Sequence, residues 1–352
     1  MREWKVGILG ATGLVGQRLV ERLIGHPWFQ VVGLGASERS TAVPYGEVVR
    51  WRLSADPPAE AASMTVRPCD AAEFQDCDLV FSALDALVAR EVEPAFVRSG
   101  LGVVSNSSAF RRDAGVPLVV PEVNGAHLEM LRDRKGDGFL VTNPNCSVTG
   151  LAMAVAPIHR AFGLRRLNVA TLQAVSGAGA AGPRALDLLG NVVPHIPGEE
   201  DKIEVELAKI LGKAGDGRYE PAGITVSAHC HRVPTLDGHL EAVSLETVRP
   251  ATADEVRDLL ESSGSDLDGL ELPSAPRRPV IVRHEPDRPQ PALDRDEEGG
   301  MAVVVGRIRA CPVLGVKLEL LSHNTVRGAA GCTILIAELL VSRELVRRRN
   351  SR

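Results

Sequence analysis

The cysteine at position 146 is the side chain whose type and surroundings point most directly to chemistry. It lies in the segment Thr142-Asn-Pro-Asn-Cys-Ser-Val-Thr-Gly150, where Pro144 precedes it and an apolar helical pattern follows it. A free cysteine is usually a buried apolar residue. At the first turn of a helix, however, backbone amides and the helix dipole stabilise a thiolate, which is the nucleophilic form. We therefore predict that Cys146 is a catalytic nucleophile.

A nucleophilic cysteine needs a partner that moves a proton, and three histidines are candidates. His229 and His231 fall at the end of one predicted strand, and His239 follows Asp-Gly at a turn. Imidazole titrates in the range that acid/base catalysis needs. Residue type alone leaves all three open, because a histidine at a strand end is more often bonded to the backbone. No metal site is expected, since these histidines lack enough neighbouring ligands.

A glycine-rich loop near the N-terminus predicts a nucleotide site. The segment Gly10-Ala-Thr-Gly-Leu-Val-Gly16 follows an apolar strand and opens a helix. Glycines let the backbone turn tightly and let a pyrophosphate approach the amides at the helix N-terminus. The expected dinucleotide contacts are Gly10, Thr12, Gly13, Leu14, Val15 and Gly16.

The end of the second predicted strand bears on which nicotinamide cofactor is used. Hydroxyl groups and a cation suit the 2′-phosphate of NADP, whereas an acidic residue suits the free ribose of NAD. Ser37, Arg39 and Ser40 favour NADP, and Glu38 among them favours NAD. We expect NADP as the cofactor and leave dual use of both cofactors open.

Two kinds of architecture must position these residues. From Lys5 to Val120, short apolar strands alternate with helical patterns, which predicts a parallel sheet covered by helices. Beyond Cys146 the strands alternate apolar and polar residues, which indicates a mixed or antiparallel sheet. The expected fold class is α/β, with a Rossmann-type parallel-sheet domain and an α+β catalytic and dimerisation domain. The expected boundaries are 1–145 plus 324–352 for the first, discontinuous domain and 146–323 for the second.

Composition excludes several classes of protein. The 352 residues carry 40 basic and 45 acidic side chains, so the basic excess of a nucleic-acid-binding protein is missing. The apolar run near Ile334 is interrupted by Glu338, and no membrane segment is expected. Six cysteines without a CxxC pair do not make a disulfide framework. We expect a cytoplasmic enzyme of small molecules.

Ten stretches in a fixed order resemble the aspartate-β-semialdehyde dehydrogenases of archaeal and fungal type. They are GATGLVG, ASERS…PYGEVVRW, SNSSAFR, VPLVVPEVN, NPNCSVTG, LQAVSGAG, HCHRVPTLDGH, LPSAP, DRPQP and SHNTVRGAAG. The resemblance implies NADPH-dependent reductive dephosphorylation of L-aspartyl 4-phosphate to L-aspartate 4-semialdehyde, through a cysteine thioester, in lysine, threonine and methionine biosynthesis. It assigns Cys146 as the nucleophile, His239 as the acid/base, and Gln173 as a residue that positions the thioester.

The resemblance also implies which residues hold the substrate. Arg232 matches an arginine that binds the α-carboxylate, and a guanidinium grips carboxylate through two parallel bonds. Glu206 is implied to receive the substrate ammonium, with Glu204 as the alternative. Lys209 and Arg111 are implied to bind phosphate, with Arg112 as the alternative to Arg111. The expected substrate residues are Arg232, Glu206, Lys209, Arg111 and Asn145.

Further cofactor contacts are implied beside the nicotinamide and at the end of a Rossmann strand. The residues implied are Ser82, Ala83, Leu84, Ser176, Gly177 and Asn324. The family pattern implies a homodimer or a homotetramer.

Two other functions remain open. An NADPH-dependent reductase of acyl-CoA thioesters, of the malonyl-CoA type, could use the same scaffold. His231 favours it, because the semialdehyde dehydrogenases often have asparagine before the substrate arginine. A catalytically silent nucleotide-binding regulator is the third possibility, but Cys146 and His239 are both present.

Overall fold

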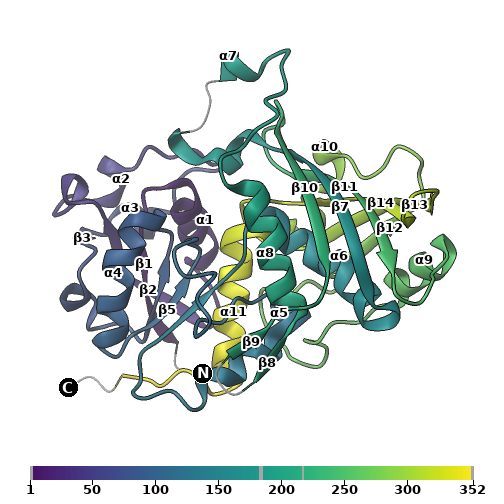
Figure 1. Cartoon of the computed structure of the whole chain (residues 1–352). Coiled ribbons are helices and arrows are strands. Elements are labelled where there is room, and N and C mark those ends of the chain that lie inside the picture. Colours follow the sequence, from purple (N-terminus) through teal and green to yellow (C-terminus); the bar gives the residue numbers. More distant parts are fainter. Residues whose placement is uncertain (1–2, 182–184, 216–217, 350–352) are drawn as a thin grey trace.

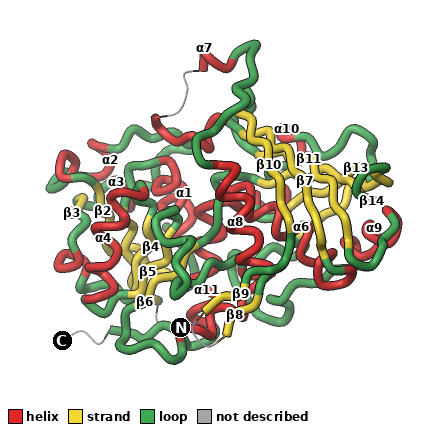
Figure 2. Tube along the Cα trace, viewed as in Figure 1, coloured by secondary structure: helices red, strands yellow, loops and turns green. Residues whose placement is uncertain are grey.

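The chain folds around two six-stranded sheets that lie side by side, with helix α11 (Gly331–Ser342) between them (Figure 1). The structure is a computed structural model that describes residues 3–181, 185–215 and 218–349. Residues 1–2 and 350–352, the outer ends of the predicted first domain, lie outside these ranges. Figure 2 shows the strands gathered into two groups, one on each side of the central helices.

The first sheet is parallel throughout, as the alternation of strands and helices predicts. Its order is β3-β2-β1-β4-β5-β6. Strands β2 and β3 are added on one side of β1 and strands β4 to β6 on the other, so the strand order reverses between β1 and β4. Ligands of such sheets bind at that point, beyond the carboxyl ends of the strands. The strands are β1 (Trp4–Leu9), β2 (Phe29–Ala36), β3 (Val66–Pro68), β4 (Leu79–Ser82), β5 (Gly102–Ser105) and β6 (Phe139–Thr142).

The second sheet is mixed and has the order β10-β7-β11-β14-β13-β12. Its outer pairs β10–β7 and β12–β13 are parallel, and its inner pairs are antiparallel. The two sheets together confirm the predicted fold class. The strands are β7 (Leu164–Gln173), β10 (Thr225–Arg232), β11 (His239–Thr247), β12 (Val280–Arg283), β13 (Val303–Cys311) and β14 (Gly315–Ser322), with a separate hairpin of β8 (Lys213–Gly215) and β9 (Arg218–Glu220).

One face of the mixed sheet is buried against helices α6 and α8, and the opposite face is more open. Along β7 the buried side chains alternate with exposed ones, as expected for a half-buried strand.

In the described residues no helix is long and apolar enough to cross a membrane. The α-helices are α1 (Leu14–Leu23), α2 (Tyr45–Val48), α3 (Ala59–Ala62), α4 (Ala86–Arg98), α5 (Pro121–Asn124), α6 (Cys146–Phe162), α7 (Ala185–Leu188), α8 (Glu199–Leu211), α9 (Ala253–Ser262), α10 (Pro291–Asp294) and α11.

The C-terminal helix differs from the single helix that the sequence suggests over 324–349. It begins with a π-helical turn, η6 (Val326–Ala330), and α11 then ends at Ser342. Both pack in one hydrophobic core with β1 and β2 of the parallel sheet. A π-helical turn is uncommon and often marks a functional site.

A buried ion pair holds η6 in place. Arg327 is fully buried, and its Nη1 and Nη2 donate to the two carboxylate oxygens of Glu122 at 2.7 and 2.5 Å. Glu122 lies on α5, so the pair ties the π-helical turn to a segment more than half the chain away. Two parallel charge-assisted bonds fix both distance and orientation.

We predict that Arg327→Met destabilises the protein by about 3–5 kcal/mol, because it leaves the Glu122 carboxylate buried without a partner. Urea unfolding followed by circular dichroism measures the change. Arg132→Met is the control, since Arg132 pairs with Glu129 on the exposed surface away from the mixed sheet, and it should have little effect. A loss no larger than that of the control would contradict a structural role for the buried pair.

Candidate active site

Cys146 is the first residue of α6, directly after the last strand of the parallel sheet. The Asn145 side chain caps this helix, because its Oδ1 accepts the N–H groups of Ser147 and Val148. Gly328 of η6 packs against the cysteine so closely that a Cβ there would lie 2.7 Å from the Cβ of Cys146. The nucleophile is thus held between a capped helix and the π-helical turn.

Strand register brings three predicted residues into one row. Arg232, the last residue of β10, pairs with Gln173, the last residue of β7. Leu240 pairs with Leu172, so His239 at the start of β11 lies on the other side of Gln173. All three side chains are buried on the helix-covered face of the sheet.

The row meets the nucleophile at His239. Its Nε2 lies 3.2 Å from the Sγ of Cys146, and its Nδ1 accepts the N–H of Ala174 at 3.1 Å. Because Nδ1 is used as an acceptor, the neutral ring carries its proton on Nε2, facing the sulfur. His239 therefore points a proton donor at the reacting atoms.

Burial keeps both members of this pair neutral. It raises the pKa of the Cys146 thiol to about 12; the charge of Glu199 raises it further, and those of Arg111 and Arg232 oppose the shift. Burial, followed by the charge of Arg232, lowers the pKa of His239 to about 3. The expected thiolate is thus wrong for the ligand-free protein, since desolvation outweighs the helix amides.

Two glutamates of helix α8 accept hydrogen bonds from Asn145, the residue before the nucleophile. The Oε2 of Glu206 accepts the backbone N–H of Asn145 at 2.7 Å, and the Oε1 of Glu199 accepts from the Asn145 Nδ2, also at 2.7 Å. Glu199 was not among the residues predicted from the sequence. Its position seven residues before Glu206 places it on the same helical face, and this spacing is the signal that could have found it.

Arg111 and Lys209 lie together on the other side of Glu206. The Nη1 of Arg111 is 3.4 Å from the Oε1 of Glu206, and its Nη2 donates to the carbonyl of Asn106. Its buried Nε has no hydrogen-bond partner among the described residues. Lys209 donates to the carbonyls of Arg111, Asp113 and Val116 at 2.8 to 2.9 Å. The Lys209 ammonium thus anchors the segment that carries Arg111, and its direct contact with phosphate stays a prediction.

Hydrogen bonds to nearby residues fix the side chains of both Arg232 and Gln173. The Nη1 of Arg232 donates to the carbonyl of Ala174 at 2.7 Å. The Nε2 of Gln173 donates to Glu199 at 3.2 Å and to Thr171 at 3.3 Å. A Cβ on Gly177 would lie 2.9 Å from both Arg232 and His239, so only glycine lets the 175–181 segment cover them.

The predicted nucleotide loop has the backbone shape that the motif requires. Gly10 has φ +75°, and a Cβ there would lie 2.7 Å from the carbonyl of Ala83. A Cβ on Gly16 would lie 2.1 Å from the carbonyl of Gly10, which allows only glycine. Helix α1 begins after Gly13 with no side-chain cap and no acidic residue in its first turn. Its first amides are therefore free for an anion. Thr12, Leu14 and Val15 complete this turn.

The remaining predicted cofactor residues lie at three places. Ser82, Ala83 and Leu84 follow each other at the end of β4, and Ser37, Arg39 and Ser40 follow β2, with Ser37 and Arg39 exposed. Asn324, Ser176 and Gly177 form the third place, beside the catalytic row, where the Asn324 Nδ2 donates to the Ser176 Oγ and its Oδ1 accepts from the N–H of Gly238, both at 2.8 Å.

Four alternative residues lie apart from this cluster. His229 and His231 project from β10 on the opposite face to Arg232, following the alternation of the strand. Glu204 accepts the N–H of Ala228, and Arg112 is exposed. The structure therefore does not bring these four side chains to Cys146.

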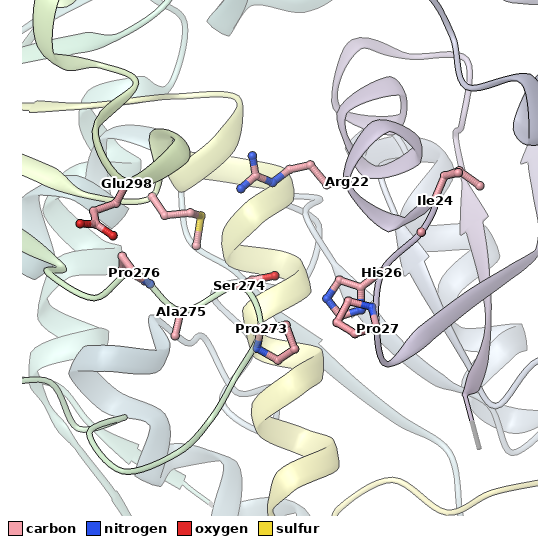
Figure 3. Close-up of a pocket in the computed structure, with 11 residues that line it drawn as sticks. Arg22, Ile24, His26, Pro27, Pro273, Ser274, Ala275, Pro276 and Glu298 are labelled. Atoms are coloured by element: carbon pink, nitrogen blue, oxygen red, sulfur yellow. The ribbon is translucent and has the colours of Figure 1, made fainter. Parts of the chain in front are cut away.

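A groove of about 440 Å³ lies elsewhere, between the end of α1 and the segment Pro273–Pro276 (Figure 3). Its polar side chains are engaged: Arg22 donates to the carbonyl of Gly299, and His26 lies 2.9 Å from Glu338. None of the predicted site residues lines it. The catalytic cluster and this groove are separate features.

Comparisons with known proteins identify the class. Residues 5–131 match the family model described as the semialdehyde dehydrogenase NAD binding domain, and residues 155–327 match the semialdehyde dehydrogenase dimerisation domain. The site and both sheets thus define a semialdehyde dehydrogenase.

Similar proteins and a similar crystal structure show which semialdehyde dehydrogenase family the chain belongs to. The chain is 48% identical to the aspartate-semialdehyde dehydrogenase of Archaeoglobus fulgidus, over 97% of this chain and 99% of the relative. It is 45% identical to that of Schizosaccharomyces pombe, over 97% and 99%. The crystal structure of the Candida albicans enzyme with NADP matches with a TM-score of 0.91 at 41% identity, covering 97% of this chain and all of that one. The chain belongs to the aspartate-semialdehyde dehydrogenase family.

We predict that alkylation of Cys146 by iodoacetamide in the ligand-free protein accelerates about tenfold per pH unit from pH 7 to pH 9. The reason is that the thiolate is a small fraction of a thiol whose pKa is raised to about 12. Mass spectrometry of the Cys146 peptide measures the rate. A rate that levels off below pH 9 would contradict the neutral pair.

Proposed function

We propose that this enzyme catalyses the reversible NADPH-dependent reductive dephosphorylation of L-aspartyl 4-phosphate to L-aspartate 4-semialdehyde. The reaction belongs to lysine, threonine and methionine biosynthesis. The observation that carries the proposal is the 3.2 Å contact between the Cys146 sulfur and His239, in one row with Gln173 and Arg232. Membership of the aspartate-semialdehyde dehydrogenase family supports the choice of substrate.

NADP is the proposed cofactor. The cradle around Gly10, Gly13 and Gly16 fits a pyrophosphate, because side chains there would fill the space it needs. Ser37 and Arg39 at the end of β2 are proposed to meet the 2′-phosphate, and the NADP complex of the Candida albicans relative supports this cofactor. When bound, NADPH supplies a hydride to the acyl carbon.

Cys146 forms the covalent bond to the substrate, and His239 acts as a hydrogen-bond donor in the step that follows. The sulfur attacks C4 of aspartyl phosphate, the carbon–oxygen bond to phosphate breaks, and the thiol proton leaves with the phosphate. His239 need not accept this proton, which agrees with its lowered pKa, since the neutral ring is a weak base and its Nδ1 already accepts the N–H of Ala174. The Nε2–H of His239 then donates to the oxygen that becomes negative when hydride reaches the thioester. The carbon–sulfur bond finally breaks as the carbonyl re-forms, and the departing sulfur takes from solvent a proton that replaces the one lost with phosphate.

The substrate is held by charge. Arg232 is proposed to bind the α-carboxylate and Glu206 the ammonium group. Arg111 is proposed to bind the phosphate, and its buried Nε without a partner supports this role. Lys209 is proposed to assist through the segment that it anchors.

The position of the His231 side chain weighs against the acyl-CoA reductase alternative. His231 was the residue that favoured it, and β10 directs this side chain to the face opposite Arg232. The acyl-phosphate reaction is therefore the better supported of the two.

A homodimer is the proposed assembly. The family model that matches residues 155–327 is a dimerisation domain. In the part of the chain that the structure describes, one face of the mixed sheet has no helix packed on it, and Leu172 and His229 are exposed there. A second copy packed on that face would bury it. We further propose that the described C-terminal segment, residues 324–349, completes the first domain, and the shared core of α11 with β1 supports this.

We expect the purified protein to reduce NADP⁺ with aspartate semialdehyde only when phosphate is present. The increase of NADPH absorbance with time measures the rate. Cys146→Ser should abolish turnover while leaving the fold intact, because a hydroxyl is a far weaker nucleophile near neutral pH. Activity with CoA and malonate semialdehyde, and none with phosphate, would replace the proposal by the acyl-CoA reductase.

Arg232→Lys should lower kcat/KM for aspartate semialdehyde about ten- to a hundredfold, since the charge remains but the two-pronged grip is lost. A small aldehyde without the α-carboxylate should lose much less, and steady-state kinetics on both aldehydes measures the difference. Equal losses on the two aldehydes would mean that Arg232 serves the fold or His239 instead.

A further inference from the structure

A small hairpin outside both six-stranded sheets brings an aromatic ring to Lys209. Its strands β8 and β9 follow α8 in the chain, and Figure 1 shows them beside the end of that helix. Tyr219 of β9 lies with its ring over the Lys209 ammonium, and the Nζ is 4.5 Å from the ring centroid. The proposed reaction steps do not use this ring.

Two backbone contacts fix the hairpin against the last turn of α8. A Cβ on Gly212, the residue after the helix, would lie 2.2 Å from the carbonyl of Glu220, so only glycine lets β9 return so closely. Just beyond β9, the N–H of Ala222 donates to the carbonyl of Ala208 at 2.9 Å. Because Ala208 directly precedes Lys209, this bond sets β9 beside the lysine.

A second ring supports Tyr219. It belongs to His127 of the 3-10 helix η3 (Gly125–Leu131), and the two ring centroids are 5.2 Å apart. The His127 Nδ1 lies 3.0 Å from the Nδ2 of Asn124, and the Asn124 Oδ1 accepts the N–H of Val120. The amide therefore holds the imidazole in one orientation, and Tyr219 packs against a fixed neighbour.

All three N–H donors of the Lys209 ammonium are engaged. They donate to the carbonyls of Arg111, Asp113 and Val116 at 2.8 to 2.9 Å. The face of the Tyr219 ring, which is electron-rich and attracts cations, covers the same ammonium. We call these three carbonyls and this ring the lysine cage. It ties residues 111–116 to α8.

The lysine cage must hold a charge that burial disfavours. Burial lowers the pKa of Lys209 to about 8, and the charges of Asp113 and Glu206 oppose this shift. His127 faces the ammonium as well: burial lowers its pKa, and the charge of Lys209 lowers it further. The ring attracts the ammonium and not the neutral amine, so it favours the form that can donate to all three carbonyls.

We propose that Tyr219 is a positioning residue for the phosphate site, because its ring keeps the Lys209 ammonium on the carbonyls of residues 111–116 and so holds Arg111 in place. The inference rests on the proposed function, in which Arg111 binds the phosphate. The contact between the ring and the ammonium does not depend on the substrate.

Tyr219→Leu tests this role by its effect on phosphate alone. The variant fills part of the same space but has no aromatic face, so residues 111–116 lose their hold on Arg111. In the NADP⁺-reducing direction we expect the KM for phosphate to rise about three- to tenfold. The KM for aspartate semialdehyde should stay within twofold of wild type. Steady-state kinetics with each substrate varied in turn measures both values.

Tyr219→Phe is the matched control, since it removes only the hydroxyl group and keeps the ring over the ammonium. Its KM for phosphate should stay within twofold of wild type. Replacing Tyr219 with pentafluorophenylalanine is the second variant. This ring is close to phenylalanine in shape, but its fluorines withdraw electron density from the face that attracts a cation. Its KM for phosphate should therefore rise about threefold or more over that of Tyr219→Phe.

The charge of Lys209 gives a readout that needs no substrate. NMR of the lysine ¹³Cε signals over a pH titration measures the pKa of Lys209 in the two ring variants. Both bury the ammonium alike, so the fluorinated ring should lower this pKa by about 0.5 relative to Tyr219→Phe.

A phosphate KM within twofold of wild type in Tyr219→Leu, or an equal rise in the KM for aspartate semialdehyde, would overturn the inference. If Tyr219→Leu does not fold, the two ring variants decide, and equal phosphate KM values in them would overturn it. If the wild-type protein shows no phosphate-dependent activity, the proposed function fails. The NMR titration then still tests the contact, and equal Lys209 pKa values in the two ring variants would refute it.

Discussion

The register of three neighbouring strands is the constraint on which the active site depends. Arg232, Gln173 and His239 come from β10, β7 and β11, and they share a row only because the backbone hydrogen bonds pair these strands in one alignment. A slip of one residue would turn a side chain to the opposite face of the sheet. The buried apolar side chains below the row, such as Val169 and Val243, therefore secure the catalytic geometry as well as the core.

Desolvation governs the chemistry that this geometry can perform. The thiol and the imidazole are both driven to their neutral forms, although the thiol lies at a helix N-terminus beside two arginines. Helix α8 supplies the compensating polar contacts, since Glu199 and Glu206 hold the nucleophile turn from one helical face. The site is thus arranged to bind polar groups tightly without carrying a permanent thiolate.

Local patterns predicted the two sheets, the nucleotide loop and the nucleophile, because each depends on residues close together in sequence. The partner of a buried polar group depends on tertiary packing and could not be predicted in the same way. Glu199 and the Glu122–Arg327 pair went unnoticed for that reason. Lys209 was expected to face phosphate, yet three backbone carbonyls surround its ammonium. The expected thiolate was wrong because a sequence does not show how deeply a helix end is buried.

The contact between Gly328 and Cys146 has a consequence for how the enzyme is made. Asn143, just before the nucleophile, also donates to the carbonyl of Gly328, which is 185 residues away in the chain. A ribosome must therefore synthesise the chain through Gly328 before the contact that encloses the nucleophile can form. Nascent chains that carry Cys146 without the segment around Gly328 have no assembled site, so the sulfur gains its catalytic surroundings only after at least 182 further residues have been synthesised.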